Sequence, residues 1–160
     1  MEIKIGLDDG ICQQLTQHLS FLLADTYVLY AKTQNFHWNI QDPRFYSLHL
    51  LLEKQYQELA EALDEIAERI RMLGKPAPGT LKKFLNMTSL KESVDEEISG
   101  DDMLQELLND HETLCRYIRE RLELVSKLGD EGTADLLIQR LRSHEKSAWM
   151  LRSHLFTIPL

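Results

Sequence analysis

The sequence predicts an all-α protein, a four-helix bundle with a short extra helix in the long connection between helices 2 and 3. Two observations support this fold class. The seven glycines and four prolines fall at a few places and leave four long segments free of both residues, at 11–42, 44–73, 101–128 and 133–158. Within each segment, apolar residues recur at steps of three and four, as on one face of a helix.

Each predicted helix carries one apolar stripe, which suits packing in a bundle. The stripes are, in chain order, Leu15, Leu19, Leu22, Thr26, Leu29, Thr33 and Phe36; Leu48, Leu52, Leu59, Leu63, Ile66 and Ile70; Leu104, Leu108, Cys115, Ile118, Leu122 and Val125; and Leu137, Leu141, Ala148, Leu151 and Leu155. Trp149 is also expected in the core. The sequence holds no internal repeat, so residues 1–160 are predicted to form a single domain.

The connection at residues 74–100 separates the second and third predicted helices. It contains "GKPAPG" and then "TLKKFLNM", where Thr80 is positioned to cap a short helix. This connection is long enough to run along the bundle. It therefore allows a crossover between distant helix ends, as in ferritin-like topologies, and not a tight hairpin.

Composition and charge exclude several classes of protein. No run of 18 apolar residues is present, and "MEIKIGLDDG" has neither the basic nor the apolar region of a signal peptide, so we expect a cytoplasmic protein with no membrane contact. Cys12 and Cys115 stand alone and are predicted to be reduced packing residues. The net charge of -8 opposes binding to nucleic acid and attracts cations.

The chemistry-bearing residues lie in "QNFHWNIQDPRFYSLHLLLEKQYQELAEALDEIAERI". On a wheel of about 100° per residue with His49 at zero, Glu53 falls near 40°, Asp64 near 60° and Glu68 near 100°. This face points roughly 130° away from the apolar stripe of the same segment. His49 and Asp64 are separated along the axis by roughly 22 Å, which is too far for one metal ion. One chain therefore cannot close this site.

Two chains related by a two-fold axis could close it. The residue numbers of His49 and Glu68 add to the same value as those of Glu53 and Asp64. An antiparallel partner helix would therefore place His49 opposite Glu68, and Glu53 opposite Asp64, at each end of a dimer. Small side chains at Ala60 and Ala67 would let the helices approach closely.

Imidazole and carboxylate ligands suit iron, manganese or zinc, and carboxylates favour the higher charge of Fe(III). A site inside the bundle would instead need ExxH motifs, and no histidine here has a glutamate three residues before it. The competing interpretation is that these charged residues form a solvated helix face. His111 and His144, on near-apolar faces, are interpreted as buried histidines with satisfied hydrogen bonds.

The motifs "FHWN", "LH", "LDEIAER", "GDEGTADLL" and "HEKSAWMLRSHL" closely resemble the Dps family, the miniferritins that protect DNA during starvation. The resemblance implies a homododecameric shell with ferroxidase centres shared across two-fold dimer interfaces, where hydrogen peroxide oxidises Fe(II) and ferric mineral is stored. By motif position it implies that His37, His49 and Glu53 are catalytic metal ligands from one subunit. Asp64 and Glu68 correspond to the ligands from its mate.

The resemblance leaves several alternatives open. Trp38 would either intercept oxidising equivalents beside the metal centre or only pack. Asp130 and Asp135 match an acidic segment near a three-fold pore, although a helix cap explains Asp130 almost as well. Glu58, Glu61 and Glu65 are either mineral nucleation sites or part of a solvated face.

The alternative function is a structural or DNA-compacting shell with a vestigial metal site. We expect no appreciable direct DNA binding, because "MEIKIGLDDG" and the residues after Trp149 carry few cations and every subunit of a shell would be acidic.

Overall fold

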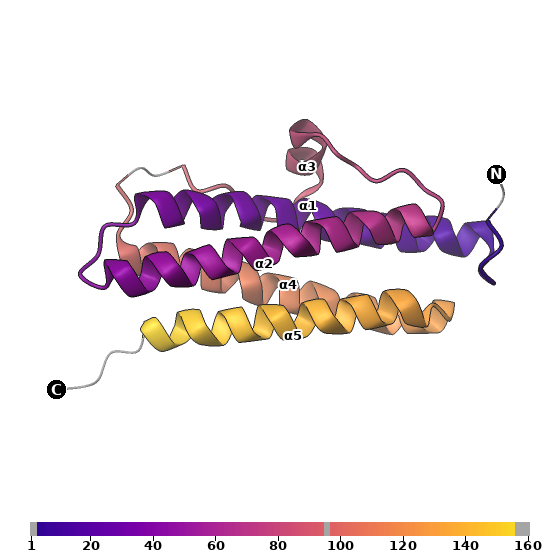
Figure 1. Ribbon diagram of the computed structural model, residues 1–160. Helices are drawn as coiled ribbons and strands as arrows, with labels where there is room; N and C mark the ends of the chain where they lie inside the picture. Colours follow the sequence, from indigo (N-terminus) through magenta and orange to yellow (C-terminus); the bar gives the residue numbers. More distant parts are fainter. Residues whose placement is uncertain (1–2, 95–96, 156–160) are drawn as a thin grey trace.

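The computed structural model describes residues 3–94 and 97–155. They form α1 (Asp9–Asn39), α2 (Phe45–Met72), α3 (Leu81–Met87), α4 (Gly100–Leu128) and α5 (Glu131–His154), with no strand among them. Helices α1 and α2 pack as an antiparallel pair against α4 and α5, and α3 lies outside the bundle over α1 (Figure 1). The structure thus confirms the predicted all-α bundle with a short extra helix.

The connection between α2 and α4 is a crossover. From the end of α2 the chain passes through α3 and returns along α1, so that α4 begins at the end of the bundle where α2 also begins (Figure 1). Helices α2 and α4 therefore run in the same direction, as the long connection predicted.

Side-chain caps define where the helices start. The carboxylate of Asp8 accepts a hydrogen bond from the backbone of Ile11 at 2.8 Å, and Ser99 accepts from Asp102 at 3.2 Å. Thr80 caps α3, as predicted, by accepting from Lys83. Such caps satisfy backbone donors that the first turn leaves unpaired. Gly129 ends α4 with φ of 74°, a left-handed conformation that suits glycine.

The first helix ends at Asn39, three residues before the predicted end at Asp42. Ile40 is extended, and Asp42 precedes Pro43, whose ring disfavours helical backbone at the residue before it. Asp42 instead starts a turn, in which its carboxylate accepts from the backbone and the guanidinium of Arg44. These hydrogen bonds, led by the Arg44 side chain, lower the pKa of Asp42 to about 2. The turn reverses the chain and leads directly into α2.

The fourth long helix begins at Glu131, earlier than the predicted residue 133, and ends at His154. Residues 156–158 of the predicted segment lie outside the described residues.

The predicted stripes form most of the buried core. Even its polar members fit, because Thr26 and Thr33 are fully buried and donate to backbone carbonyls four residues earlier, each at 2.7 Å. Cys12 is buried and Cys115 half-buried, both as free thiols. The prediction for Trp149 is wrong: its side chain is 61% exposed, because its position lies about 80° round α5 from the core residue Leu141 and about 160° from the core residue Leu151. No helix in the described part of the chain is long and apolar enough to cross a membrane.

Candidate metal centre

His37, near the end of α1, and His49, near the start of α2, stack ring on ring. Their centroids lie 3.9 Å apart with an angle of 16° between the planes. Each ring is also held by the backbone of the other residue. Nδ1 of His37 lies 2.9 Å from the carbonyl oxygen of His49, and Nδ1 of His49 lies 2.9 Å from the carbonyl oxygen of His37. This reciprocal pair joins the two helices just above the turn that connects them.

The reciprocal bonds fix the chemistry of both rings. A carbonyl oxygen can only accept, so each Nδ1 must carry the proton and donate it. In a neutral imidazole the lone pair then stands on Nε2, the atom that would bind a metal. Metal-binding histidines commonly have their second nitrogen oriented in this way by a backbone carbonyl. Each ring therefore presents an Nε2 lone pair that could coordinate a metal ion.

Aromatic rings and one carboxylate surround the pair. Phe45 stacks on His49 at 4.9 Å, and the ring of Tyr56 meets His37 edge-on at 5.1 Å. Glu53 follows His49 by one helical turn on α2 and is half-buried. His37 is only 7% exposed, so this end of the site is largely withdrawn from water.

Asp64 and Glu68 are exposed on α2, more than three helical turns beyond His49. No group of three or more histidine, cysteine, aspartate or glutamate side chains able to hold a metal occurs among the described residues. The structure therefore brings His37 and His49 together but does not bring Asp64 and Glu68 to them within one chain. Completion of the site by a second chain stays a prediction.

An open groove of about 400 Å³ runs along the same face of α2. Its walls come from α1, α2, α3 and the segment before α3, and their side chains are apolar apart from the carboxylate of Asp64 and the phenol of Tyr27. The lining residues are Leu23, Tyr27, Ala60, Leu63, Asp64, Ala67, Pro78, Gly79, Leu81 and Phe84. Leu81 is 64% exposed at its edge. An apolar face of this kind on a single chain is typical of a surface that another chain covers.

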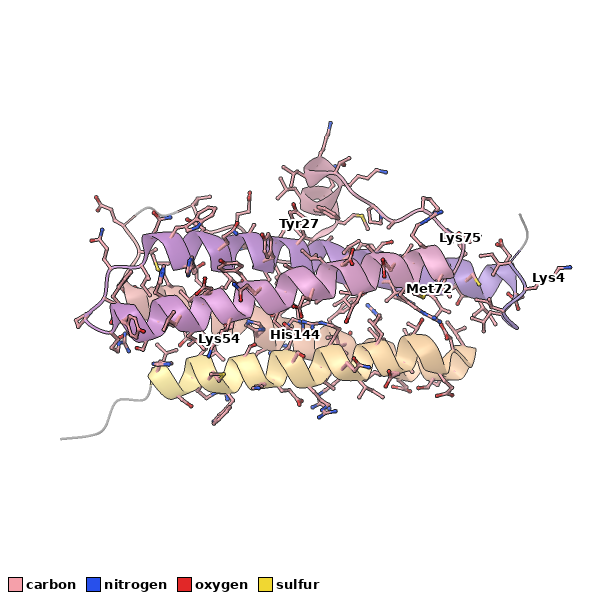
Figure 2. All side chains as sticks on the ribbon, in the orientation of Figure 1. Lys4, Tyr27, Lys54, Met72, Lys75 and His144 are labelled. Carbon is pink, nitrogen blue, oxygen red and sulfur yellow. The ribbon has the colours of Figure 1, made fainter. Side chains whose placement is uncertain are left out.

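The bundle interior holds a second histidine pair that the sequence did not reveal as a pair. Nδ1 of His111 on α4 lies 2.9 Å from Nδ1 of His144 on α5, and both residues are fully buried. His144 is labelled in Figure 2, where it lies between α2 and α5. Arg140 can only donate to Nε2 of His144, so His144 donates through Nδ1 to His111. Nε2 of His111 then has no partner, so the expectation that both histidines are fully satisfied is wrong for His111.

Burial and the charge of Arg140 keep both interior histidines neutral. Desolvation first, and then Arg140, lowers the pKa of His111 to about 3. The pKa of His144 also lies well below 6.5, chiefly because of burial. A cation-binding role for this pair is disfavoured by the guanidinium beside it.

Two of the acidic residues singled out by the sequence are already paired. Glu58 forms an ion pair with the buried guanidinium of Arg140. Asp130 caps α5 through Gly132 and Thr133 and binds Arg69. Glu61, Glu65 and Asp135 are exposed. The cap interpretation of Asp130 is therefore confirmed, and its carboxylate does not stand free.

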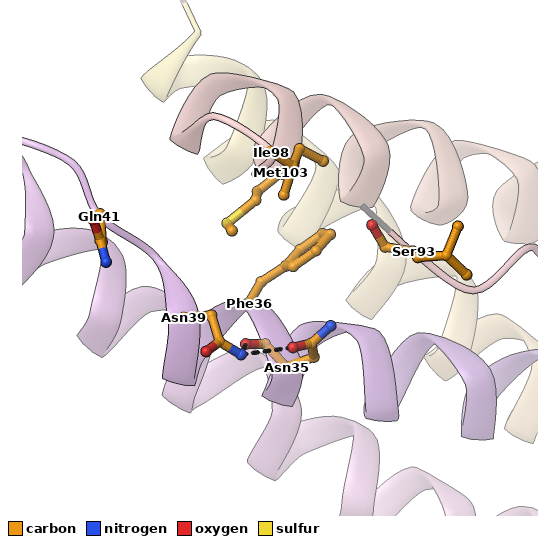
Figure 3. Close-up of a pocket in the computed structure, with 8 residues that line it drawn as sticks. Asn35, Phe36, Asn39, Gln41, Ser93, Ile98 and Met103 are labelled. Carbon is orange, nitrogen blue, oxygen red and sulfur yellow. Dashed lines mark hydrogen bonds between the residues drawn. The ribbon is translucent and has the colours of Figure 1, made fainter. Parts of the chain in front are cut away.

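A cavity of about 600 Å³ lies between α1 and the segment before α4 (Figure 3). Amide, hydroxyl and apolar side chains line it, and on its α1 side Asn39 donates to the backbone and side chain of Asn35, one helical turn earlier. These two residues lie about 160° round α1 from His37. The described lining residues supply no carboxylate or imidazole, so as far as the structure describes the chain this cavity is separate from the histidine site.

The chain matches the ferritin-like domain model over residues 16–160. Among curated proteins it is 40% identical over 159 residues to an uncharacterized low temperature-induced protein of Nostoc sp., covering 99% of this chain and 89% of that protein. It is 36% identical to DNA protection during starvation protein 2 of Bacillus anthracis, over 89% of this chain and 97% of that protein.

Solved structures agree with the sequence matches. DpsC from Streptomyces coelicolor superposes with a TM-score of 0.96 at 32% identity, covering 100% of this chain and 94% of that chain. A Dps protein from Vibrio cholerae O1, described as a member of a broad superfamily of ferritin-like diiron-carboxylate proteins, superposes with a TM-score of 0.91 at 36% identity, with 98% of each chain covered.

A four-helix bundle with a crossover, matched over nearly its whole length, places this protein in the ferritin-like class. Within that class, the chain belongs to the Dps family. Family membership supports a role in iron storage and DNA protection in general terms.

Proposed function

We propose that this protein is a ferroxidase that oxidises Fe(II), preferably with hydrogen peroxide, and stores ferric mineral inside a homododecameric shell, so that DNA is protected from oxidative damage. The observation that carries the proposal is the reciprocal His37–His49 pair, whose Nδ1 atoms are both engaged by carbonyl oxygens. Because each Nδ1 is engaged in this way, the lone pair of each Nε2 would be available to coordinate a metal ion.

The residues fit iron as the substrate metal. Imidazole nitrogens bind Fe(II) well, and carboxylate oxygens stabilise Fe(III) by charge. His37, His49 and Glu53 would supply two nitrogens and one carboxylate from one chain. Asp64 and Glu68 of the partner subunit would supply the remaining carboxylates. No thiolate is included, which argues against a structural zinc site.

The two-fold arrangement explains why the ligands are divided along α2. The groove beside Ala60 and Ala67 offers an apolar face with small side chains, where a second α2 could pack antiparallel. Such packing would bring the carboxylates of one chain to the histidines of the other at both ends of the contact. Family resemblance supplies the count of twelve subunits.

In the reaction, two Fe(II) ions give up one electron each, and one hydrogen peroxide takes both electrons and two protons to become two waters. No free hydroxyl radical is formed, because the second electron arrives before a one-electron product can leave. The carboxylates hold the ferric product until it passes as mineral into the hollow interior of the proposed shell.

Anaerobic Fe(II) titration, followed by rapid mixing with peroxide, tests the proposal. The wild-type shell should bind Fe(II) saturably in the titration and should oxidise the bound Fe(II) rapidly after mixing with peroxide. The variant His37→Ala/His49→Ala should lose both properties and keep its shell, because neither ring belongs to the apolar core of the bundle.

His18→Ala is a matched control, since His18 is a half-buried histidine on the same helix but far from the pair. It should behave as wild type. Wild-type oxidation rates in the double variant would refute the site. A shell without saturable Fe(II) binding would instead support the structural or DNA-compacting alternative.

A further inference from the structure

A continuous chain of aromatic rings leads away from the histidine pair. Tyr56 on α2 meets the ring of His37 at 5.1 Å and the ring of Tyr30 at 6.2 Å. Tyr30 in turn meets Tyr27 at 6.0 Å. All three contacts are edge-on, with angles of 70°, 77° and 66° between planes. Each step joins neighbouring rings, and every ring beyond the histidine is a phenol.

The row of rings follows from the geometry of α1 and from one tyrosine that α2 places between two rings of α1. Tyr27, Tyr30, Gln34 and His37 recur at steps of three and four, so they share one face of α1. Tyr56 comes from α2 and fills the interval between Tyr30 and His37. Gln34 donates to the hydroxyl of Tyr30 at 3.3 Å. All three tyrosines are half-buried, so their rings are packed but not sealed from water.

The far end of the chain of rings lies in the open groove on α2. Tyr27 stacks on Phe84 of α3 at 4.5 Å, and Tyr27 and Asp64 line the same groove. Figure 2 shows Tyr27 on α1 beneath α3. Under the two-fold arrangement of the proposed function, Asp64 belongs to the other site of the dimer. The three tyrosines of one chain therefore run from the histidines of one site toward the carboxylate of the second site.

We propose that Tyr56, Tyr30 and Tyr27 form an electron relay between the two iron sites of a dimer; this inference rests on the proposed function. Peroxide needs two electrons, and a site that holds one Fe(II) supplies only one. Tyr56 gives the second: one Fe(II), one phenol, one peroxide and one proton yield one Fe(III), one tyrosyl radical and two waters.

The oxidising equivalent then moves by exchange of an electron and a proton from Tyr30 to Tyr56, and from Tyr27 to Tyr30. Fe(II) at the second site reduces the radical on Tyr27, which regains a proton and becomes a phenol again. The sum is two Fe(II) oxidised per peroxide, although the two ions occupy different sites. Direct transfer between sites along α2 would span roughly 22 Å, whereas the steps from Tyr56 through Tyr30 to Tyr27 each join adjacent rings.

The test is freeze-quench electron paramagnetic resonance on the intact shell, mixed with peroxide after anaerobic loading. With one Fe(II) per dimer, the wild type should show a tyrosyl radical. With two Fe(II) per dimer, the signal should decay as the second iron is oxidised. Tyr30→Phe keeps the ring and removes the phenol, so its radical should remain on Tyr56 and persist at both loadings.

Tyr56→Phe should lose the radical and release hydroxyl radical that a spin trap captures at the lower loading, while Fe(II) binding stays unchanged. Tyr46→Phe is the control, because Tyr46 is near the histidines in sequence but 77% exposed and outside this chain of rings. It should match the wild type.

The outcomes separate the two proposals. If the wild type neither binds nor oxidises Fe(II), the proposed function fails. If it oxidises Fe(II) but Tyr56→Phe and Tyr30→Phe match the wild type in radical yield and decay, the relay is wrong. A radical assigned to the exposed Trp38 in place of a tyrosine would also overturn it.

Discussion

Arg69 on α2 donates to both carboxylate oxygens of Asp130, the cap of α5, at 2.7 and 2.8 Å. The guanidinium also donates to the hydroxyl of Thr133 at 3.0 Å. Burial alone would raise the pKa of Asp130, but hydrogen bonds from Thr133 and Arg69 outweigh it and the pKa is lowered. This pair ties the start of α5 to the end of α2.

Asp130→Ala should destabilise the fold by about 3 kcal/mol, because it removes a helix cap and leaves a partly buried guanidinium unpaired. Thermal or denaturant unfolding measures the loss. Asp135→Ala is the control: Asp135 is exposed, and within the described part of the chain its hydrogen bond is to Gln139 of its own helix, so a change within about 0.5 kcal/mol is expected. Equal stability of the two variants would contradict the structural role of Asp130.

The interior pair His111–His144 should make the protein sensitive to acid. Both imidazoles are neutral when folded, with Arg140 and its partner Glu58 beside them, whereas in the unfolded chain they titrate near 6.5. Below that pH the unfolded state binds more protons than the folded state. The contribution of these histidines to the free energy of unfolding is therefore fully present above pH 6.5 and is lost as the pH falls toward about 3. For His111 alone the loss over this range approaches about 5 kcal/mol.

The measurement is the unfolding free energy against pH for the wild type and for His111→Leu/His144→Leu. Replacing both partners of a buried hydrogen bond by apolar groups costs little, so the double variant should fold at neutral pH and lose much of the acid sensitivity. His144→Leu alone should be less stable than the double variant, because it leaves both nitrogens of His111 unpaired. The same acid profile in the double variant as in the wild type would show that other groups control it.

Subunit mixing should reveal the division of the iron site between chains. His37→Ala/His49→Ala chains lack the histidines, and Asp64→Ala/Glu68→Ala chains lack the carboxylates, so neither should oxidise Fe(II) by itself. When the two are unfolded together and reassembled, half of the randomly formed dimers are mixed and each holds one complete site. Peroxide-dependent oxidation should then return to roughly a quarter of the wild-type level. Reassembly without recovery would count against a shared site.

Metal-free protein should not bind duplex DNA appreciably at neutral pH. The charge of -8 per subunit repels a polyanion, and many of the cations, such as Arg119 and Arg152, are already paired with glutamates. Lys82 and Lys83 on α3 are exposed and form the basic patch that could bind DNA if this prediction is wrong. A gel shift without magnesium or iron is the measurement. A retarded complex that dissolves with added salt would show that such a patch suffices.

Much of the architecture could be predicted from the sequence because it depends on local chemistry. Helix periodicity placed Leu48, Leu52 and Leu59 on one buried face, and Thr80 marked the start of α3. The same periodicity separated Glu53, Asp64 and Glu68 from the core, and these residues are indeed half-buried or exposed. Angular position on a single helix follows from spacing alone.

Contacts between helices needed the tertiary structure. The spacing of His37 and His49 is compatible with many turn conformations. In the structure, the chain reversal at Asp42 and Arg44 stacks the two rings and lets each Nδ1 hydrogen-bond to the backbone carbonyl of the other histidine. The partners of Glu58, Asp130 and His111 lie 33 to 82 residues away, on other helices. Tyr56 likewise joins the tyrosines of α1 only because α2 packs at this register. Periodicity fixes which face a side chain occupies, whereas crossing angle and axial offset decide what it meets there.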